Sequence, residues 1–115
     1  ITDLILQALT KNEITLMTNG EEERQFIHIY DCVKNMLIAR NLTEKEIDFT
    51  NNQWIKIKSI AEIISRKFQC KLHVGEKKGY DNKIDANDTY KYLKFYINIE
   101  DGIDKVILDA KKYLH

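Results

Sequence analysis

The segment from Thr18 to Asp31 carries the residue best suited to bind a ligand. It reads TNGEEERQFIHIYD and contains Arg24, one of only three arginines in a chain of 115 residues. An arginine at the entry of a strand, near the start of a helix, can bind a phosphate through two parallel hydrogen bonds. Arg24 could instead be a surface cation that balances the negative charges of Glu21–Glu23, because most clusters of charged side chains are solvated. The residues alone leave both interpretations open.

The elements around Arg24 would position it. Asn19-Gly20 lies between two apolar runs, Ile14–Met17 and Phe26–Tyr30, and this dipeptide accepts the positive φ angles of a two-residue hairpin turn. The pattern therefore predicts a β-hairpin whose second arm ends at Asp31. A carboxylate there can cap the helix that follows and complement its positive end.

The same segment resembles a motif of a known enzyme superfamily. Gly20, Arg24, Phe26-Ile27-His28-Ile29 and Asp31 are similar to the GxxxRxFIHVxD segment of extended short-chain dehydrogenases, the NAD-dependent sugar-nucleotide epimerases, dehydratases and ketoreductases. The order of the later elements agrees with the last third of that family. The resemblance implies an α+β fold, the C-terminal part of a Rossmann-type epimerase/dehydratase, with a small mixed sheet, a hairpin and four to five packing helices.

Hydrophobic periodicity and end signals predict where these elements lie. Strands are expected at Ile47–Asn52, which ends in an Asn turn, and at Lys71–Val74. Ser59 and Glu62 have the spacing of a capping box, and Asn98 is expected to cap the last helix. The predicted helices are Ile1–Thr10, Cys32–Arg40, Ser59–Phe68, Asp85–Leu93 and Ile99–Leu114, and Val33, Met36 and Leu37 form the packing stripe of the second.

Three further residues are candidates for substrate contacts. In the resembled family a second arginine near residues 76–82 joins the first in binding the substrate diphosphate, and here the cations are Lys77 and Lys78. They could equally belong to a solvated loop, since lysine lacks the guanidinium fork. Trp54 follows the Asn turn and could stack on a base or sugar, or fill a hydrophobic gap. His28 is expected to be a packed position, with no second metal ligand at a suitable spacing.

The chemistry of the resembled enzymes is expected to lie outside these residues. With four glycines, the sequence offers no glycine-rich strand-to-helix turn for a dinucleotide. We expect NAD(P) to bind to the intact enzyme, in the missing N-terminal Rossmann domain, and not to this part, which is expected to lack the catalytic Tyr-x-x-x-Lys pair. No catalytic residue and no metal ligand are predicted within residues 1–115.

Composition limits the partners. The formal net charge is zero, which argues against nucleic acid, since non-specific binding to it needs a concentrated positive face. Cys32 and Cys70 form no disulfide framework, so a reduced, cytoplasmic setting is expected. No apolar run is long enough to span a membrane. The chain begins with Ile1 instead of Met, and we expect a piece of a longer protein.

The sequence thus predicts one domain, residues 1–115, that binds the nucleotide sugar in an NAD-dependent epimerase or dehydratase. One alternative is part of a sugar-nucleotide 4-ketoreductase of the same superfamily. The other is a stand-alone α+β interaction domain with no enzymatic parent. The exposed surface distinguishes a portion of an enzyme from a stand-alone domain. A portion that docks against the rest of an enzyme should expose an apolar face, whereas a self-contained domain would cover it.

Overall fold

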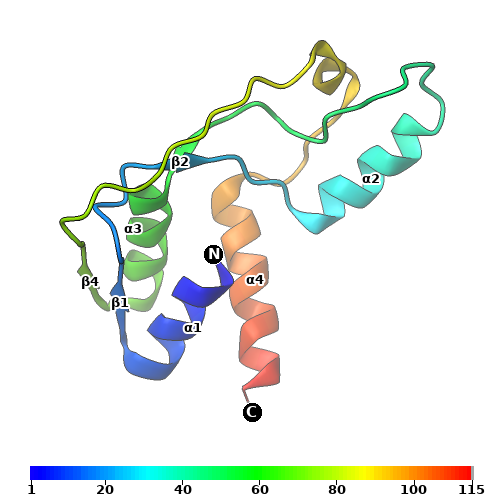
Figure 1. The fold of residues 1–115 in the computed structure, drawn as a ribbon. Coiled ribbons are helices and arrows are strands. Elements are labelled where there is room, and N and C mark those ends of the chain that lie inside the picture. Colours follow the sequence, from blue (N-terminus) through cyan, green and yellow to red (C-terminus); the bar gives the residue numbers. More distant parts are fainter. Residues whose placement is uncertain (115) are drawn as a thin grey trace.

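The computed structural model describes residues 1–114, in which helices lie beside two short two-stranded sheets (Figure 1). The α+β class is confirmed, with four α-helices and a mixed arrangement of strands. The elements in chain order are α1 (Thr2–Lys11), β1 (Glu13–Thr15), β2 (Glu23–Arg24), α2 (Ile29–Ala39), β3 (Ile55–Lys56), α3 (Ile57–Phe68), β4 (Lys71–His73), the 3-10 helix η1 (Asp88–Tyr92) and α4 (Ile99–Tyr113).

One hydrophobic core joins the first, third and last α-helices to the β1–β4 pair. Most apolar positions of these helices face inward, as their periodicity indicates. Tyr113 and Leu114, at the end of the predicted last helix, were expected to continue its apolar stripe but are 88% and 48% exposed. Asn98 caps α4 as expected, because its Oδ1 accepts from the backbone N–H of Asp101 at 2.8 Å. The core residues with the least exposure are Ile5, Ile14, Ile60, Ala61, Ile64 and Ile103.

The strands pair differently from the predicted hairpin. β1 is parallel to β4, with Ile14 opposite Leu72, and β2 is antiparallel to β3, with Arg24 opposite Ile55. The hairpin across Asn19-Gly20 is therefore wrong, because its first arm pairs with β4, which is distant in sequence, and its predicted second arm, Phe26–Tyr30, forms no strand. Of the two turn residues only Gly20 has a positive φ, 75°. It serves a bend that carries the chain from one sheet to the other.

Gly20 fits this bend because nothing larger has room there. A Cβ at this position would lie 2.7 Å from the Cβ of Lys58, and an L-residue with this φ is strained. We expect Gly20→Ala to lower the free energy of unfolding by about 1–3 kcal/mol. The measurement is urea unfolding followed by circular dichroism.

Gly102 supplies the matched control for this prediction. It lies inside α4, where an added Cβ meets its nearest atoms at an ordinary 3.7 Å. Gly102→Ala is therefore expected to raise stability by about 0.5–1 kcal/mol. Equal urea midpoints for Gly20→Ala and the parent chain would contradict the role assigned to Gly20.

Helix α2 begins earlier than predicted and is capped differently. Phe26–His28 form no strand, and the helix starts at Ile29 with His28 as its N-cap, whose Nδ1 accepts from the N–H of Tyr30 at 3.1 Å. Asp31 is thus not the cap. Its carboxylate is 1% exposed and accepts from the N–H groups of Tyr96 and Ile97, at 3.1 and 3.0 Å.

Asn35, one turn after Asp31, completes the buried face of α2. Its side chain binds both backbone groups of Lys94, with its Oδ1 accepting at 2.9 Å and its Nδ2 donating at 2.8 Å. Residues four apart lie on one face of a helix, so Asp31 and Asn35 together hold the 94–97 segment as a neighbouring strand would. The side of α2 that faces the protein is therefore polar.

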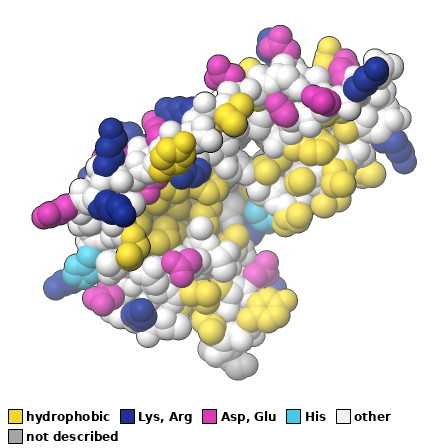
Figure 2. All heavy atoms as spheres, in the orientation of Figure 1, with side chains coloured by type: hydrophobic (Ala, Val, Ile, Leu, Met, Phe, Trp, Pro, Cys, Tyr) yellow, Lys and Arg dark blue, Asp and Glu magenta, His cyan; other side chains and the backbone are white. Residues whose placement is uncertain are grey.

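The opposite face of α2 is apolar and exposed. The predicted packing stripe of Val33, Met36 and Leu37 is half exposed, at 50–56%, so the expectation that it packs within this chain is wrong. Figure 2 shows hydrophobic side chains gathered over the α2 lobe. A helix with buried polar and exposed apolar residues reverses the usual pattern of a surface helix. We name Ile29, Tyr30, Val33, Met36 and Leu37 the α2 apolar face.

Three local predictions are corrected by the structure. Residues 47–50 form no strand, although Asn52 has the positive φ of a turn, 56°. α3 begins at Ile57, two residues before the predicted start, so Ser59 is inside the helix and the capping box does not form. The Asp85–Leu93 helix shortens to the 3-10 turn η1, which Asn87 caps.

The overall shape is flat and open. The chain measures 48 × 35 × 17 Å and has a Cα radius of gyration of 16.0 Å, whereas a compact domain of this length has about 13 Å. Its accessible surface of 8078 Å² exceeds by about 1,500 Å² the area typical of a folded protein of this mass. The hydrophobic core therefore lies at one end, and the α2 lobe extends away from it (Figure 1).

Candidate functional site

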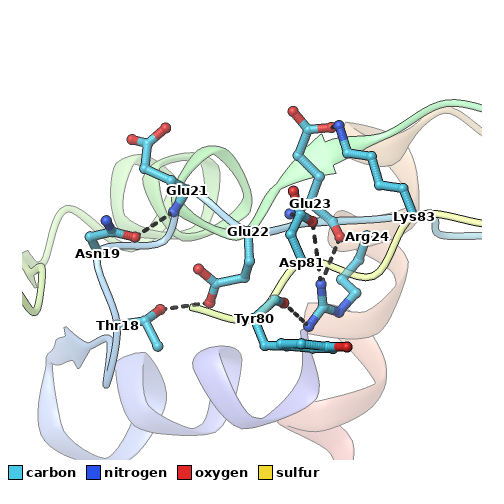
Figure 3. A network of polar contacts seen from close by, with 9 residues as sticks. All are labelled: Thr18, Asn19, Glu21, Glu22, Glu23, Arg24, Tyr80, Asp81 and Lys83. Carbon is cyan, nitrogen blue, oxygen red and sulfur yellow. Dashed lines mark hydrogen bonds and ion pairs between the residues drawn. The ribbon is translucent and has the colours of Figure 1, made fainter. Parts of the chain in front are cut away.

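Arg24 is held in place by two backbone carbonyls. Its Nη1 donates to the carbonyl of Glu23 at 2.7 Å, and its Nη2 donates to the carbonyl of Tyr80 at 3.0 Å. The carboxylate of Asp81 lies 3.9 Å from Nη1, beyond hydrogen-bond distance. Figure 3 shows the guanidinium directed at residues 80–81. Arg24 is therefore oriented mainly by neutral groups, and its side chain is 45% exposed.

The 75–83 loop brings Tyr80 and Asp81 to Arg24. Its start is fixed by hydrogen bonds from the N–H of Gly75 to the carbonyl of Thr18, and from the N–H of Asn19 to the carbonyl of Lys77, at 3.0 and 2.8 Å. Its end is fixed by Asp81, whose Oδ1 accepts from the N–H of Glu23 at 3.1 Å. The loop thus lies along the chain that leads into β2.

A second group of charges lies on the other side of β2. Lys83 forms an ion pair with Glu23, and its Nζ also lies 5.7 Å from the centre of the Trp54 ring. Lys56 pairs with Glu21 at 2.6 Å. Figure 3 shows Lys83 and Glu23 turned away from the guanidinium of Arg24. Neighbouring side chains of a strand alternate between faces, which explains why Glu23 and Arg24 diverge.

These close pairs stabilise the charged forms of their members. The hydrogen bond to the Glu23 carboxylate raises the pKa of Lys83 above its usual value, and the bond to Glu21 does the same for the pKa of Lys56. The pKa of Glu21 is lowered by its hydrogen bond with Lys56. Both lysines are therefore cations that already have a counter-ion.

The structure does not gather the four predicted site residues. Arg24 lies against the 75–83 loop, whereas Trp54 lies with Lys83. Lys77 and Lys78 are exposed, and neither forms an ion pair with any residue in the described part of the chain. The cation that the sequence interpretation missed is Lys83. Its position after Asp81 was the available signal, because that segment was already a candidate for anion contacts.

A large apolar cleft lies next to the Arg24 strand. It has a volume of about 490 Å³ and runs between α4, the start of the chain and the residues that follow β2. Arg24 is not part of its wall, but Ile55, which lies opposite Arg24 in the β2–β3 pair, and Phe26, two residues further along the chain, are. Residues that line the cleft include Phe26, His28, Asn51, Ile55, Ile99 and Val106.

A smaller cavity of about 420 Å³ lies between α1 and residues 15–22. Glu22 reaches its wall and accepts at Oε1 a hydrogen bond of 2.6 Å from the hydroxyl of Thr18. The other oxygen, Oε2, is buried with no hydrogen-bond partner in the structure. Gly79 packs directly against this carboxylate, because an added Cβ would lie 2.2 Å from Oε2.

Two pairs in this chain have the Tyr-x-x-x-Lys spacing, Tyr30/Lys34 and Tyr90/Lys94. The expectation that the spacing is absent is therefore wrong. Tyr30 and Lys34 lie on one face of α2, with the lysine Nζ 5.5 Å from the centre of the tyrosine ring and over its face. Lys94 lies beyond the end of η1. Neither pair adjoins Arg24 through a contact in the structure.

Within 1–114, no group of three or more His, Cys, Asp or Glu side chains is arranged to hold a metal ion. In the same range, no helix is both long enough and apolar enough to cross a lipid bilayer.

The chain is similar to enzymes of one family in sequence and fold. Residues 1–49 match the family model described as the NAD dependent epimerase/dehydratase family. Among solved structures, the NAD-dependent NDP-hexosamine 5,6-dehydratase TunA has a TM-score of 0.80 and 19% identity and is matched by 96% of this chain. The UDP-glucose 4-epimerase of Thermotoga maritima, solved with UDP-glucose, has a TM-score of 0.79, 14% identity and 98% coverage of this chain.

A third neighbour is the UDP-glucuronic acid 4-epimerase of Bacillus cereus, solved with UDP-glucuronic acid and NAD. It has a TM-score of 0.71 and 20% identity, and 97% of this chain is aligned to it. The chain spans 39% of the length of each of these three structures. A match to residues 1–49 in sequence, and to nearly the whole chain in fold, confirms the resemblance to NAD-dependent epimerases and dehydratases.

Proposed function

We propose that this chain is the substrate-binding portion of an NAD(P)-dependent enzyme that epimerises or dehydrates a nucleotide sugar. Arg24 carries the proposal, because its guanidinium is fixed by two carbonyls and keeps three N–H groups without an acceptor among residues 1–114. A guanidinium with free, oriented donors matches the oxygens of a phosphate. The T. maritima and B. cereus neighbours were solved with UDP-sugars, which supports a nucleoside diphosphate as the ligand.

The proposal assigns the cofactor to another part of the enzyme. A dinucleotide needs a glycine-rich turn that leads from a strand directly into a helix. None of the four glycines, Gly20, Gly75, Gly79 and Gly102, lies in such a turn. The residues described here therefore do not fit the pyrophosphate of NAD(P), and no chemical step is assigned to them. The two free cysteines are compatible with the expected reducing, cytoplasmic setting.

The α2 apolar face supports docking against the nucleotide-binding portion of the same enzyme. This face is held toward solvent by the buried contacts of Asp31 and Asn35 on its other side. The accessible surface exceeds that of a compact domain by about 1,500 Å², and one partner in a stable interface buries about 800 Å². The alternative of a self-contained monomeric domain predicts that this apolar area would be covered.

Dye binding tests the exposed face. We expect the chain to enhance the fluorescence of a dye that binds apolar surface, and a Met36→Ser/Leu37→Ser double variant to reduce that signal without loss of stability. Met17→Ser is the matched control, since Met17 is 86% exposed but lies outside α2. If the double variant unfolds at a clearly lower urea concentration, these side chains are already packed and the proposed docking face is wrong.

The complete reading frame tests the proposed function. We expect codons before Ile1 that encode a strand, a glycine-rich turn and a helix, followed by a Tyr-x-x-x-Lys pair. The protein expressed from that frame should bind UDP in a calorimetric titration and bind NAD(P). A frame that begins at or just before Ile1 would leave the stand-alone domain as the better account. Product analysis with UDP-sugars separates an epimerase or dehydratase from a 4-ketoreductase.

A further inference from the structure

The counter-ion of Arg24 is unusually loose. Three ion pairs surround β2, and in two of them the lysine nitrogen lies within direct hydrogen-bond distance of a carboxylate, as in Lys56–Glu21 at 2.6 Å. Arg24 and Asp81 are 3.9 Å apart, with side chains 45% and 44% exposed. The carboxylate of Asp81 thus interacts electrostatically with the guanidinium without a direct hydrogen bond.

Other contacts explain why Asp81 remains at this distance. Its Oδ1 accepts from the N–H of Glu23 at 3.1 Å, and the carbonyl of the preceding residue, Tyr80, accepts from the Nη2 of Arg24. The 75–83 loop therefore places a carboxylate beside the guanidinium and leaves the remaining donors free. The bond to Glu23 helps to order the loop, and the charge of Asp81 has a second consequence.

We propose that Asp81 is an internal anion that competes with the substrate diphosphate for Arg24. This inference rests on the proposed function and adds to the same site a residue that weakens anion binding. A carboxylate 3.9 Å away offsets part of the positive field of the guanidinium and repels an arriving phosphate. The charge of Asp81 therefore lowers the affinity of this site for anions, and the diphosphate binds in spite of it.

Asp81→Asn separates charge from loop order. The asparagine keeps an oxygen that can accept from Glu23 and removes the negative charge. Asp85→Asn is the matched control, because it removes one charge from an exposed position nearby that has no contact with Arg24. Inorganic pyrophosphate and UDP are titrated into the protein from the complete reading frame, and thermal unfolding confirms that each variant is folded.

The expected result is tighter binding of both probes to Asp81→Asn, by about two- to fivefold, the range that an exposed ion pair contributes. Asp85→Asn should bind as the parent does. The gain should shrink at high salt and be smaller in the Arg24→Ala background, where only the repulsion between Asp81 and the phosphate remains.

Two outcomes distinguish the failure of this inference from failure of the proposed function. If the parent protein binds pyrophosphate and Arg24→Ala weakens it, but Asp81→Asn binds equally or more weakly, Asp81 orders the loop only and the inference is overturned. If the parent binds neither pyrophosphate nor UDP, the proposed function fails first. A gain of the same size in Asp85→Asn would show a general charge effect and would also overturn the inference.

Discussion

Replacing Arg24 by alanine is expected to raise the dissociation constant for UDP about ten- to a hundredfold. A charge-assisted contact of this kind contributes about 1.5–3 kcal/mol, and 1.4 kcal/mol corresponds to a factor of ten. The loss should be large because the guanidinium is already oriented by the carbonyls of Glu23 and Tyr80. Calorimetric titration of the protein from the complete reading frame is the measurement.

Two further variants make the Arg24 result specific. Arg24→Lys keeps the charge but loses the planar fork, so it should fall between the parent and Arg24→Ala. Arg66→Ala removes the same charge from α3, where Arg66 pairs with Glu100 across to α4, and should leave the constant unchanged. An Arg24→Ala protein that binds UDP within about twofold of the parent would remove Arg24 from the site.

Asp31→Ala is expected to destabilise the fold by about 3–5 kcal/mol. The carboxylate is 1% exposed and binds the N–H groups of Tyr96 and Ile97. Alanine would leave both part-buried donors without their acceptor and would release the 94–97 segment from α2. Domains of this size are stable by only about 5–15 kcal/mol, so a large fraction of the stability depends on this side chain.

Urea unfolding measures the Asp31 effect. Asp31→Asn should be less severe, because one oxygen still accepts a hydrogen bond. Lys34→Ala is the control within the same helix, since Lys34 is exposed. A change below about 1 kcal/mol for Asp31→Ala, the size of an ordinary surface substitution or smaller, would show that α2 is held by other contacts.

The sequence predicted helices better than strand pairing, for physical reasons. α1, α3 and α4 each carry a continuous apolar stripe that packs within the chain, so periodicity identified them and their buried residues. β1 pairs with β4, which lies 58 residues later, from Ile14 to Leu72. Local turn chemistry at Asn19-Gly20 holds no information on such a distant partner, and the hairpin prediction failed there.

In helix α2 the hydrophobic periodicity predicted the helix correctly, but it did not predict which face of the helix is exposed. The Val33, Met36 and Leu37 stripe predicted a helix, and the helix is present. Its orientation depends on two buried polar side chains whose partners lie around 60 residues away. Arg24 was found from its residue type and local context, whereas the approach of Asp81 depends on the path of the 75–83 loop.

The shared core of the first and last helices has a consequence for biosynthesis. Ile103 and Ile107 of α4 pack in the same cluster as Ile5 of α1. During translation, residues from α1 to β4 must therefore remain without their final cover until α4 has been synthesised. In that interval Ile5, Ile60 and Ile64 are available to chaperones and proteases. A nascent chain arrested within η1 should be degraded faster than one arrested after α4, which pulse-chase labelling can follow.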